Sequence, residues 1–411
     1  MSRWMGGLAV VAALLLLAAA VPADRMTVTL EPEDYSVLRD DQACRIEMQG
    51  FGQLMEPGSP LLPMKRFLFL LPPGARAVSV ELVSSDAIEL ERCLELEPFV
   101  GVLPLTAGPE LELELQALRR QWQANNSSVY GSDQPYPERV AWLSGAGTLR
   151  KYSYAAVAFC PFTYHPLSGT LLLHERAEVA IEYVLPQAGS SEAIHLERLM
   201  SDDAADVRAR ELFVNYEDLA VLYGPARPSA GRSDTYDYVI VTTSALADAV
   251  SSSGFDEWKS ELGFSLRTVL VTDPEISGQP GEDLAERIRN FLREYYGPWG
   301  IEYVLFVGDY ASVPMRVCYP DSSFHVYDPS SPGLVAPGTP TDCYYADLSY
   351  PDEDSWDLDG DGYPGEYNQD LPDFMPEVFV GRIPVNDTNR ITYALDKTVA
   401  FEQDTGPWKS S

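Results

Sequence analysis

Cationic residues are scarce in this chain of 411 residues. It has 29 Lys and Arg against 62 Asp and Glu, so its formal net charge at pH 7 is −33. A surface of this charge repels phosphate groups, which argues against nucleic acid and anionic membranes as partners. A solvated acidic surface, or sites for Ca²⁺, is the simpler reason for so many carboxylates.

Cysteine and histidine are also rare. Five cysteines do not form a disulfide framework, although Cys318 and Cys343 could pair, and buried free thiols are an equal alternative. No CxxC motif and no Cys/His cluster of zinc spacing occurs. Of the four histidines, only His325 offers Cys343 a partner for thiolate chemistry, and nothing in the sequence brings these two together. The GxSxG, HExxH, P-loop and dinucleotide-binding motifs are absent as well.

Long apolar runs are missing except at the N-terminus. Arg3 precedes an unbroken apolar run from Leu8 to Ala20, and Val21-Pro22-Ala23 ends in a small residue. This pattern is typical of a cleaved signal peptide. The alternative is a membrane anchor, but the run is shorter than the roughly 20 residues that a spanning helix needs. We therefore expect residues 1–23 to be removed and the mature protein to be secreted or held at the cell surface.

The first half of the exported chain favours short strands. Residues 77–83 and 177–184 are rich in β-branched and apolar side chains, and Pro and Gly clusters separate such segments. Residues 110–115 alternate Glu and Leu with a period of two, as a half-buried strand would; alternatively, they begin a helix that runs to Trp122. We expect residues 24–224 to form a β-rich, sandwich-like domain.

Residues 225–234 read as a linker. The segment Gly224-Pro-Ala-Arg-Pro-Ser-Ala-Gly-Arg-Ser233 is rich in small residues and Pro and carries Arg227 and Arg232. Such a stretch is exposed and easily cut. It is either an inert linker or a processing site at one of the two arginines.

From residue 235 the pattern alternates strands and helices. Strands are predicted at 238–243, 266–271, 302–309 and 377–384, and helices at 255–262, 282–296 and 389–403. This order predicts an α/β domain with a mainly parallel sheet and helices on both faces.

Two strand ends deliver a glycine and a charged residue to one edge of the predicted sheet. Gly308-Asp309 and Gly381-Arg382 lie there, at the edge where open α/β sheets bind ligands. Asp309 could orient a catalytic group, cap the following turn or bind a metal. For Arg382 we expect an ion pair with a neighbouring carboxylate.

An acidic segment lies between Thr341 and Glu377, with twelve Asp or Glu and no Lys or Arg. Asp357, Asp359 and Asp361 occupy alternate positions before a turn glycine, as in loops that bind Ca²⁺. Position 12 of such a loop is Asn368 instead of a Glu, but Glu366 could complete the shell. We expect a structural calcium site here; the alternative is a solvated acidic loop.

The order of several motifs resembles that of the gingipain-type cysteine peptidases. The motifs of the second half are Tyr236-Asp-Tyr-Val-Ile-Val241, Phe255-Asp-Glu-Trp-Lys259 with Gly263, Tyr303–Asp309, Thr341-Asp342 with Tyr344-Tyr345, and Val378–Pro384. Those of the first half, Gly58-Ser-Pro-Leu-Leu-Pro63 and Cys160-Pro-Phe-Thr-Tyr-His-Pro-Leu-Ser-Gly169, resemble the propeptide of the same family. The resemblance covers nearly all of the exported chain.

The resemblance implies a secreted cysteine endopeptidase zymogen with a caspase-like catalytic domain, of which residues 235–411 are the N-terminal part. The family's catalytic His lies in a Gly-His-Gly turn and its Cys ends a later strand. No His precedes a Gly here, so we expect both catalytic residues, and those of the S1 pocket, beyond Ser411. This chain would then hold no catalytic residue itself.

The resemblance also implies partners. The β-rich half would act as an intramolecular chaperone and latency domain, released by cleavage near Arg227 or Arg232, and proteins or peptides would be the substrates. Calcium sites are known in the family, although the acidic loop here looks like an insertion. The alternative function is that of a secreted, non-catalytic binding or adhesion protein with the same fold, stabilised by calcium.

Overall fold

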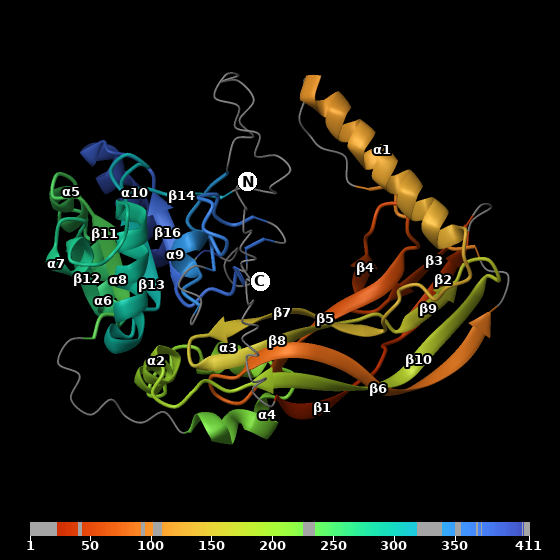
Figure 1. Ribbon diagram of the computed structural model, residues 1–411. Coiled ribbons are helices and arrows are strands. Elements are labelled where there is room, and N and C mark those ends of the chain that lie inside the picture. Colours follow the sequence, from red (N-terminus) through yellow and green to blue (C-terminus); the bar gives the residue numbers. More distant parts are fainter. Residues whose placement is uncertain are drawn as a thin grey trace, which may run out of the picture.

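The computed structural model describes residues 23–39, 43–91, 95–101, 109–224, 235–318, 339–349, 355–366, 369–370, 372–404 and 406. Within them the chain folds into a β-rich half before residue 225 and an α/β half after residue 234 (Figure 1). Of the helices that these ranges contain, none combines the length and hydropathy of a membrane span.

The β-rich half contains two antiparallel sheets of four strands each. The first consists of β1 (Asp24–Leu30), β10 (Thr170–Val184) and β6 (Arg76–Glu91), with β9 (Phe162–His165) paired to β10. The second has the order β4 (Gly52–Leu54), β5 (Leu62–Leu70), β8 (Tyr152–Phe159) and β7 (Ala141–Leu149). A hairpin of β2 (Tyr35–Arg39) and β3 (Cys44–Met48) completes this half.

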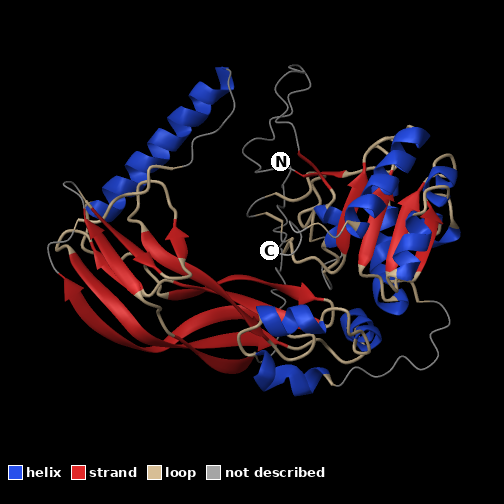
Figure 2. Cartoon of the chain, turned by 180° about the vertical axis from the view of Figure 1, so that it is seen from behind, coloured by secondary structure: helices blue, strands red, loops and turns tan. Residues whose placement is uncertain are grey.

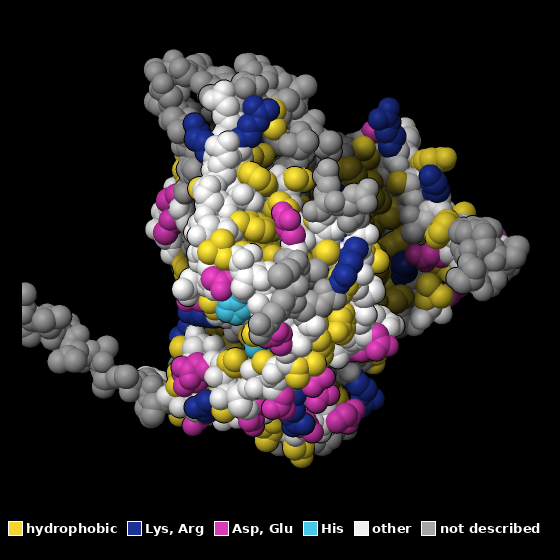
Figure 3. All heavy atoms as spheres, turned by 90° about the vertical axis from the view of Figure 1, so that its right-hand side faces the viewer, with side chains coloured by type: hydrophobic (Ala, Val, Ile, Leu, Met, Phe, Trp, Pro, Cys, Tyr) yellow, Lys and Arg dark blue, Asp and Glu magenta, His cyan; other side chains and the backbone are white. Residues whose placement is uncertain are grey.

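One apolar core joins the two sheets. Leu30, Val80 and Val179 from the first sheet pack with Phe69, Val157 and Phe159 from the second. Alternate side chains of β8 and β10 enter this core, so the predicted β-rich, antiparallel class is confirmed. Figure 3 looks onto the end of this half and shows hydrophobic side chains among acidic and basic ones on that face.

The segment with alternating Glu and Leu is helical. Helix α1 (Pro109–Tyr130) includes it, so the strand prediction was wrong and the alternative of a helix was right. Leu111, Leu115, Leu118 and Trp122 are spaced four, three and four apart, and this helical spacing continues after the alternation ends. Trp122 Nε1 donates to the carbonyl oxygen of Phe99 across 3.1 Å.

The helices α3 (Asp206–Leu212) and α4 (Tyr216–Leu219) and the 3₁₀ helix η1 (Ala220–Tyr223) cover the outer face of the second sheet near the end of this half. Helix α2 (Ser191–Leu199) packs against the α/β half instead, where its Leu199 belongs to the core. Phe213, Tyr216 and Tyr223 pack against Tyr152 and Tyr154 of β8. Sequence analysis did not predict these short helices.

The α/β half is built on a parallel sheet. Its strand order is β12 (Leu266–Leu270), β11 (Tyr238–Thr242), β13 (Tyr303–Val307) and β16 (Phe379–Ile383), and each pairing is parallel. All four strands lie within the predicted segments. A short antiparallel ribbon joins β14 (Arg316–Cys318) to β15 (Thr339–Thr341).

Helices lie on both faces of this sheet, as predicted (Figure 2). The core of one face includes α7 (Pro274–Ser277), α8 (Leu284–Trp299) and α9 (Cys343–Ala346). The core of the other face includes α5 (Ala247–Ser251), α6 (Phe255–Glu261) and α10 (Thr388–Gln403). The helices predicted at 255–262, 282–296 and 389–403 correspond to α6, α8 and α10.

Candidate functional site

Arg382 ties together the elements at the carboxyl edge of the parallel sheet. Its Nε and Nη2 atoms donate to the two carboxylate oxygens of Asp342 across 2.7 and 2.8 Å. Its Nη1 donates to the carbonyl oxygens of Gly308 at 3.1 Å and Val313 at 2.8 Å. The predicted pairing of Arg382 with a carboxylate is therefore confirmed. Because the planar guanidinium binds a carboxylate through Nε and Nη2 and backbone carbonyls through Nη1, it fixes the loops that leave the strands.

Asp309 lies at the same edge and caps the turn after β13. Its Oδ1 accepts hydrogen bonds from the backbone N–H groups of Ala311 and Ser312, both across 3.0 Å. The side chain of Asn386 and these N–H groups hold the pKa of Asp309 below its ordinary value. The ionised carboxylate is partly exposed and has this positioning role in the described structure.

None of the cysteines of the described chain forms a disulfide. They are Cys44, Cys160, Cys318 and Cys343. The pairing of Cys318 with Cys343 was wrong: the Sγ of Cys318 lies 3.5 Å from the carbonyl oxygen of Gly365, whereas Cys343 is exposed at the start of α9. Burial raises the pKa of Cys160 to about 12, which keeps this thiol protonated and unreactive. His325, the other member of the hypothetical dyad, lies outside the described residues.

The acidic loop brings three of its four predicted ligands together. One carboxylate oxygen from each of Asp357, Asp359 and Asp361 lies within 4.8 Å of the others. The loop is shaped by hydrogen bonds to its own backbone, such as that from Gly362 N to Asp357 Oδ2 at 3.1 Å. Glu366 lies outside this group; it is buried and its Oε2 accepts from Gln369 Nε2 across 2.7 Å. Three carboxylates are a donor set that suits a hard cation such as Ca²⁺.

Arg150 joins the two halves of the chain. It is the turn residue between β7 and β8, with φ of 52°, and only 3% of it is exposed. Its guanidinium donates to the carbonyl oxygens of Ile301 at 2.8 Å, Glu377 at 2.9 Å and Tyr296 at 3.1 Å. It also forms a buried ion pair with Asp202. These carbonyls precede β13 and β16 or end α8, so Arg150 binds at the amino edge of the parallel sheet, opposite Asp309.

Sequence analysis missed Arg150. Its local signal is weak: two basic residues, Arg150 and Lys151, stand between two apolar strands in a chain with few cations. Both are buried, and Lys151 Nζ pairs with Asp206 Oδ1 across 2.8 Å. Buried cations are rare without partners, but the partners of Arg150 are distant in the sequence.

The processing candidates Arg227 and Arg232 fall in the segment 225–234, outside the described residues. The structure describes their flanks only. Tyr223 ends the β-rich half as a buried side chain whose hydroxyl donates to the carbonyl oxygen of Leu71 across 2.6 Å.

Comparison with known families divides the chain in the same place. Residues 27–221 match the propeptide of family C25, and residues 232–411 match peptidase family C25 itself. The chain belongs to peptidase family C25. By this membership it is a cysteine-type peptidase with its own propeptide, and the resemblance to gingipains is confirmed. We call the β-rich half the propeptide and the α/β half the peptidase half from here on.

Solved structures of similar proteins include three from Porphyromonas gingivalis. The match to the complex of the RgpB pro- and mature domains has 19% identity and a TM-score of 0.35. It covers 49% of this chain and 95% of the matched chain. The structure on zymogenic latency of gingipain K is 17% identical and covers 39% of this chain and 88% of that chain, with a TM-score of 0.30. Dimeric latent PorU is 14% identical and covers 100% of this chain and 40% of that chain, with a TM-score of 0.30. No curated protein matches the chain.

Proposed function

We propose that this chain belongs to the precursor of a secreted C25 cysteine endopeptidase whose propeptide keeps the peptidase half latent. The observation that carries the proposal is the buried contact of Arg150 with three backbone carbonyls of the peptidase half. A fully buried guanidinium with an anionic partner and carbonyl acceptors holds two surfaces in one register. The propeptide would therefore stay bound until this contact is broken.

The proposed reaction is hydrolysis of a peptide bond by a Cys/His dyad. The thiolate attacks the scissile carbonyl carbon, while the histidine acts first as a base and then as an acid toward the leaving amine. We place both residues beyond Ser411. The carboxyl edge, where Arg382 and Asp342 brace the loops, is the proposed position of the substrate.

Calcium is the proposed structural ion of the peptidase half. Asp357, Asp359 and Asp361 would supply three oxygen ligands, and backbone oxygens or water the remainder. The ion would relieve repulsion among these carboxylates and stiffen the loop. Glu366 is not included in this ligand set because its carboxylate binds Gln369.

Secretion and processing complete the proposal. The N-terminal segment supports export, and cleavage near Arg227 or Arg232 would cut the covalent connection between the halves. The acidic loop suits the alternative of a non-catalytic adhesion protein, whereas the family matches favour the peptidase.

The test uses the protein as its natural source exports it. Endopeptidase activity is measured with fluorogenic peptides before and after limited cleavage within residues 225–234, with and without iodoacetamide. We expect low activity before cleavage, higher activity after it, and loss of activity on thiol alkylation. Activity that resists alkylation, or that never appears in the processed protein, would contradict the proposed function.

A further inference from the structure

Three carboxyl groups of the peptidase half lie at its contact with the propeptide. We refer to Asp347, Asp373 and Glu377 as the carboxyl cluster. Asp347 and Glu377 are each 1% exposed, and Asp373 is half-buried beside an open cleft of about 1710 Å³ between the halves. Glu377 Oε2 accepts from the backbone N–H of Leu348 across 2.6 Å. Asp347 Oδ2 accepts from the backbone N–H of Phe374, which follows Asp373, across 3.3 Å.

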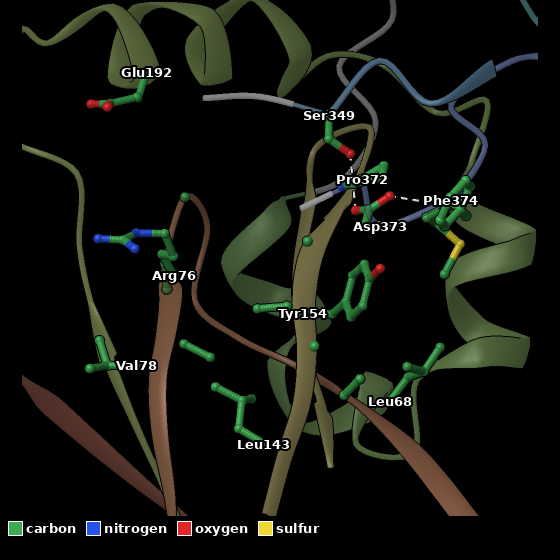
Figure 4. A pocket seen from close by; sticks show the side chains of 18 of the residues that line it. Leu68, Arg76, Val78, Leu143, Tyr154, Glu192, Ser349, Pro372, Asp373 and Phe374 are labelled. Atoms are coloured by element: carbon green, nitrogen blue, oxygen red, sulfur yellow. Dashed lines mark hydrogen bonds between the residues drawn. The ribbon is translucent and has the colours of Figure 1, made fainter. Parts of the chain in front are cut away.

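Asp373 is the member of the cluster that bridges the halves. Its Oδ2 accepts from the backbone N–H of Thr148 in the propeptide at 3.1 Å and from Ser349 Oγ in the peptidase half at 2.9 Å. Figure 4 shows this carboxyl group turned toward Ser349, with the ring of Tyr154 from β8 beside it. Gly147 approaches so closely that a Cβ atom at this position would overlap the carboxylate. The hairpin of β7 and β8 therefore withdraws Asp373 from water.

The cations around the cluster bind backbone carbonyls. Arg150 donates to the carbonyl of Glu377, Arg208 to that of Pro376, and Arg289 to those of Tyr344 and Asp347. The other charged or titratable groups that face the cluster or its surroundings are Asp202, Glu302, Arg293, Tyr154, Tyr296 and His195. Asp373 and Glu377 are the two carboxyl groups for which burial costs most. Each lies near another carboxyl group of the cluster, and this proximity disfavours the ionisation of both.

Burial, with a further contribution from Asp347, raises the pKa of Asp373 to about 7. Burial, followed by Asp373 and Asp347, also raises the pKa of Glu377 well above its ordinary value. The pKa of His195 in α2 is shifted in the opposite direction. The Nε2 atom of His195 lies 3.3 Å from the hydroxyl of Tyr296. Burial, then Arg293 and Arg198, lowers the pKa of His195 to about 4.

We propose that the carboxyl cluster is a proton-controlled latch, which holds the propeptide on the peptidase half while Asp373 and Glu377 are protonated and loosens as they ionise. The latch rests on the proposed function, in which the docked propeptide keeps the peptidase latent. It adds a physical trigger, a rise in pH, to the cutting of the linker.

The direction follows from the protons that docking takes up. After separation the carboxyl groups of Asp373 and Glu377 would face water and ionise at their ordinary pKa values. Docking would therefore bind two protons at mildly acidic pH, one at each of these groups. His195 becomes free to protonate after separation, so docking releases one proton there. In total, docking takes up one proton. The dissociation constant of the propeptide from the peptidase half should therefore rise about tenfold per pH unit between about pH 5 and pH 7.

The experiment uses the whole chain with a specific protease site placed within residues 225–234. After the cut, the dissociation constant of the two fragments is measured by analytical ultracentrifugation at about pH 5 and about pH 7. For the otherwise unchanged protein we expect a rise of about 100-fold. With Asp373→Asn, which keeps the acceptor for Thr148, the rise should shrink to about threefold or less. With His195→Gln, which keeps a hydrogen-bonding group near Tyr296, the rise should steepen to several thousand-fold, on the order of 3000-fold.

Asp256→Asn is the matched control. The pKa of Asp256 is also raised by burial, but this residue lies in α6, on the opposite face of the sheet from α8. It should leave the rise of about 100-fold unchanged. If Asp373→Asn prevents folding, Glu377→Gln provides the second test and should flatten the profile in the same way.

The outcomes separate the latch from the function on which it rests. Fragments that stay associated with the same affinity at both pH values, or a slope that Asp373→Asn leaves unchanged, overturn the latch and leave the docked propeptide intact. Fragments that bind more tightly as the pH rises also overturn it. Fragments that fail to associate at either pH overturn the proposed docking itself.

Discussion

Arg150 Nη1 donates a hydrogen bond to the carbonyl oxygen of Glu377 across 2.9 Å, although 227 residues separate them in the chain. The bond crosses from the turn of a propeptide hairpin to a residue just before β16 of the peptidase sheet. It places the propeptide at the amino edge of that sheet, while the bracing pair Arg382 and Asp342 lies at the carboxyl edge. The docking contact and the proposed substrate edge therefore lie at opposite ends of the strands, so each can be perturbed separately.

Replacement of Arg150 by Met should weaken docking strongly. The carbonyls of Tyr296, Ile301 and Glu377 would lose their donor, and Asp202 would be left as a buried charge without its partner. Loss of one partner of a buried pair costs about 3–5 kcal/mol, so the dissociation constant of the linker-cut fragments should rise at least about 150-fold. Ultracentrifugation of the cut protein measures this.

The matched control for that variant is Arg45→Met. Arg45 pairs with Glu97 at the surface, where the two side chains are 44% and 41% exposed. Its loss should cost less than about 1 kcal/mol. Equal effects of the two variants would show that the carbonyl contacts of Arg150 contribute nothing to docking.

Gly147→Ala should impair docking by steric overlap. The added methyl group would occupy the position of the Asp373 carboxylate, so either the hairpin or the loop with Asp373 must move. We expect the fragments to bind at least about fivefold more weakly, since overpacking of a tight contact costs about 1–3 kcal/mol. Gly145→Ala, whose Cβ would lie 3.8 Å from the nearest atom, is the control and should change the affinity little. Tight binding of the Gly147→Ala fragments would place Asp373 elsewhere.

Asp342→Asn should destabilise the peptidase half. The side chain of Arg382 is 7% exposed, and the amide would remove the charge that compensates its guanidinium. We expect the free energy of unfolding to fall by about 2–4 kcal/mol, measured by urea denaturation followed by circular dichroism. Glu294→Gln removes the partner of Arg198 at a site where both side chains are more than half exposed and should have almost no effect. A comparable loss for both variants would argue against the bracing role of Arg382.

Calcium should stabilise the acidic loop. If the site binds Ca²⁺, the ion at about 100 times its dissociation constant should add about 2.7 kcal/mol to the free energy of unfolding. Thermal unfolding with Ca²⁺ and with a chelator measures the difference, and Asp359→Asn should abolish it.

Asp396→Asn, an exposed carboxylate of α10, is the control for the calcium experiment and should keep the response. A chelator that leaves the melting temperature of the unsubstituted protein unchanged would make the group of Asp357, Asp359 and Asp361 a solvated loop.

The regular elements of the peptidase half could be predicted because their signals are local. The runs 238–242 and 303–307 are continuous apolar strands, and the apolar residues of α8 recur with helical spacing. The segment 110–115 shows the limit of such reasoning. Its alternation of Glu and Leu fits a strand, but Leu111 and Leu115 also share a helix face, and only the following residues decide between the two.

The sequence by itself determined the class of each half, the parallel order of strands and helices, the acidic loop and the family motifs, because each depends on residues that are near in the chain. Tertiary structure alone decided that Arg150 binds at the amino edge, that Asp373 meets Thr148, and that Cys318 and Cys343 remain apart. Asp373 and Thr148 are separated by 225 residues, and Arg150 and Ile301 by 151. Contacts of this range leave no periodic signal, because the backbone carbonyls and N–H groups that form them exist at almost every position.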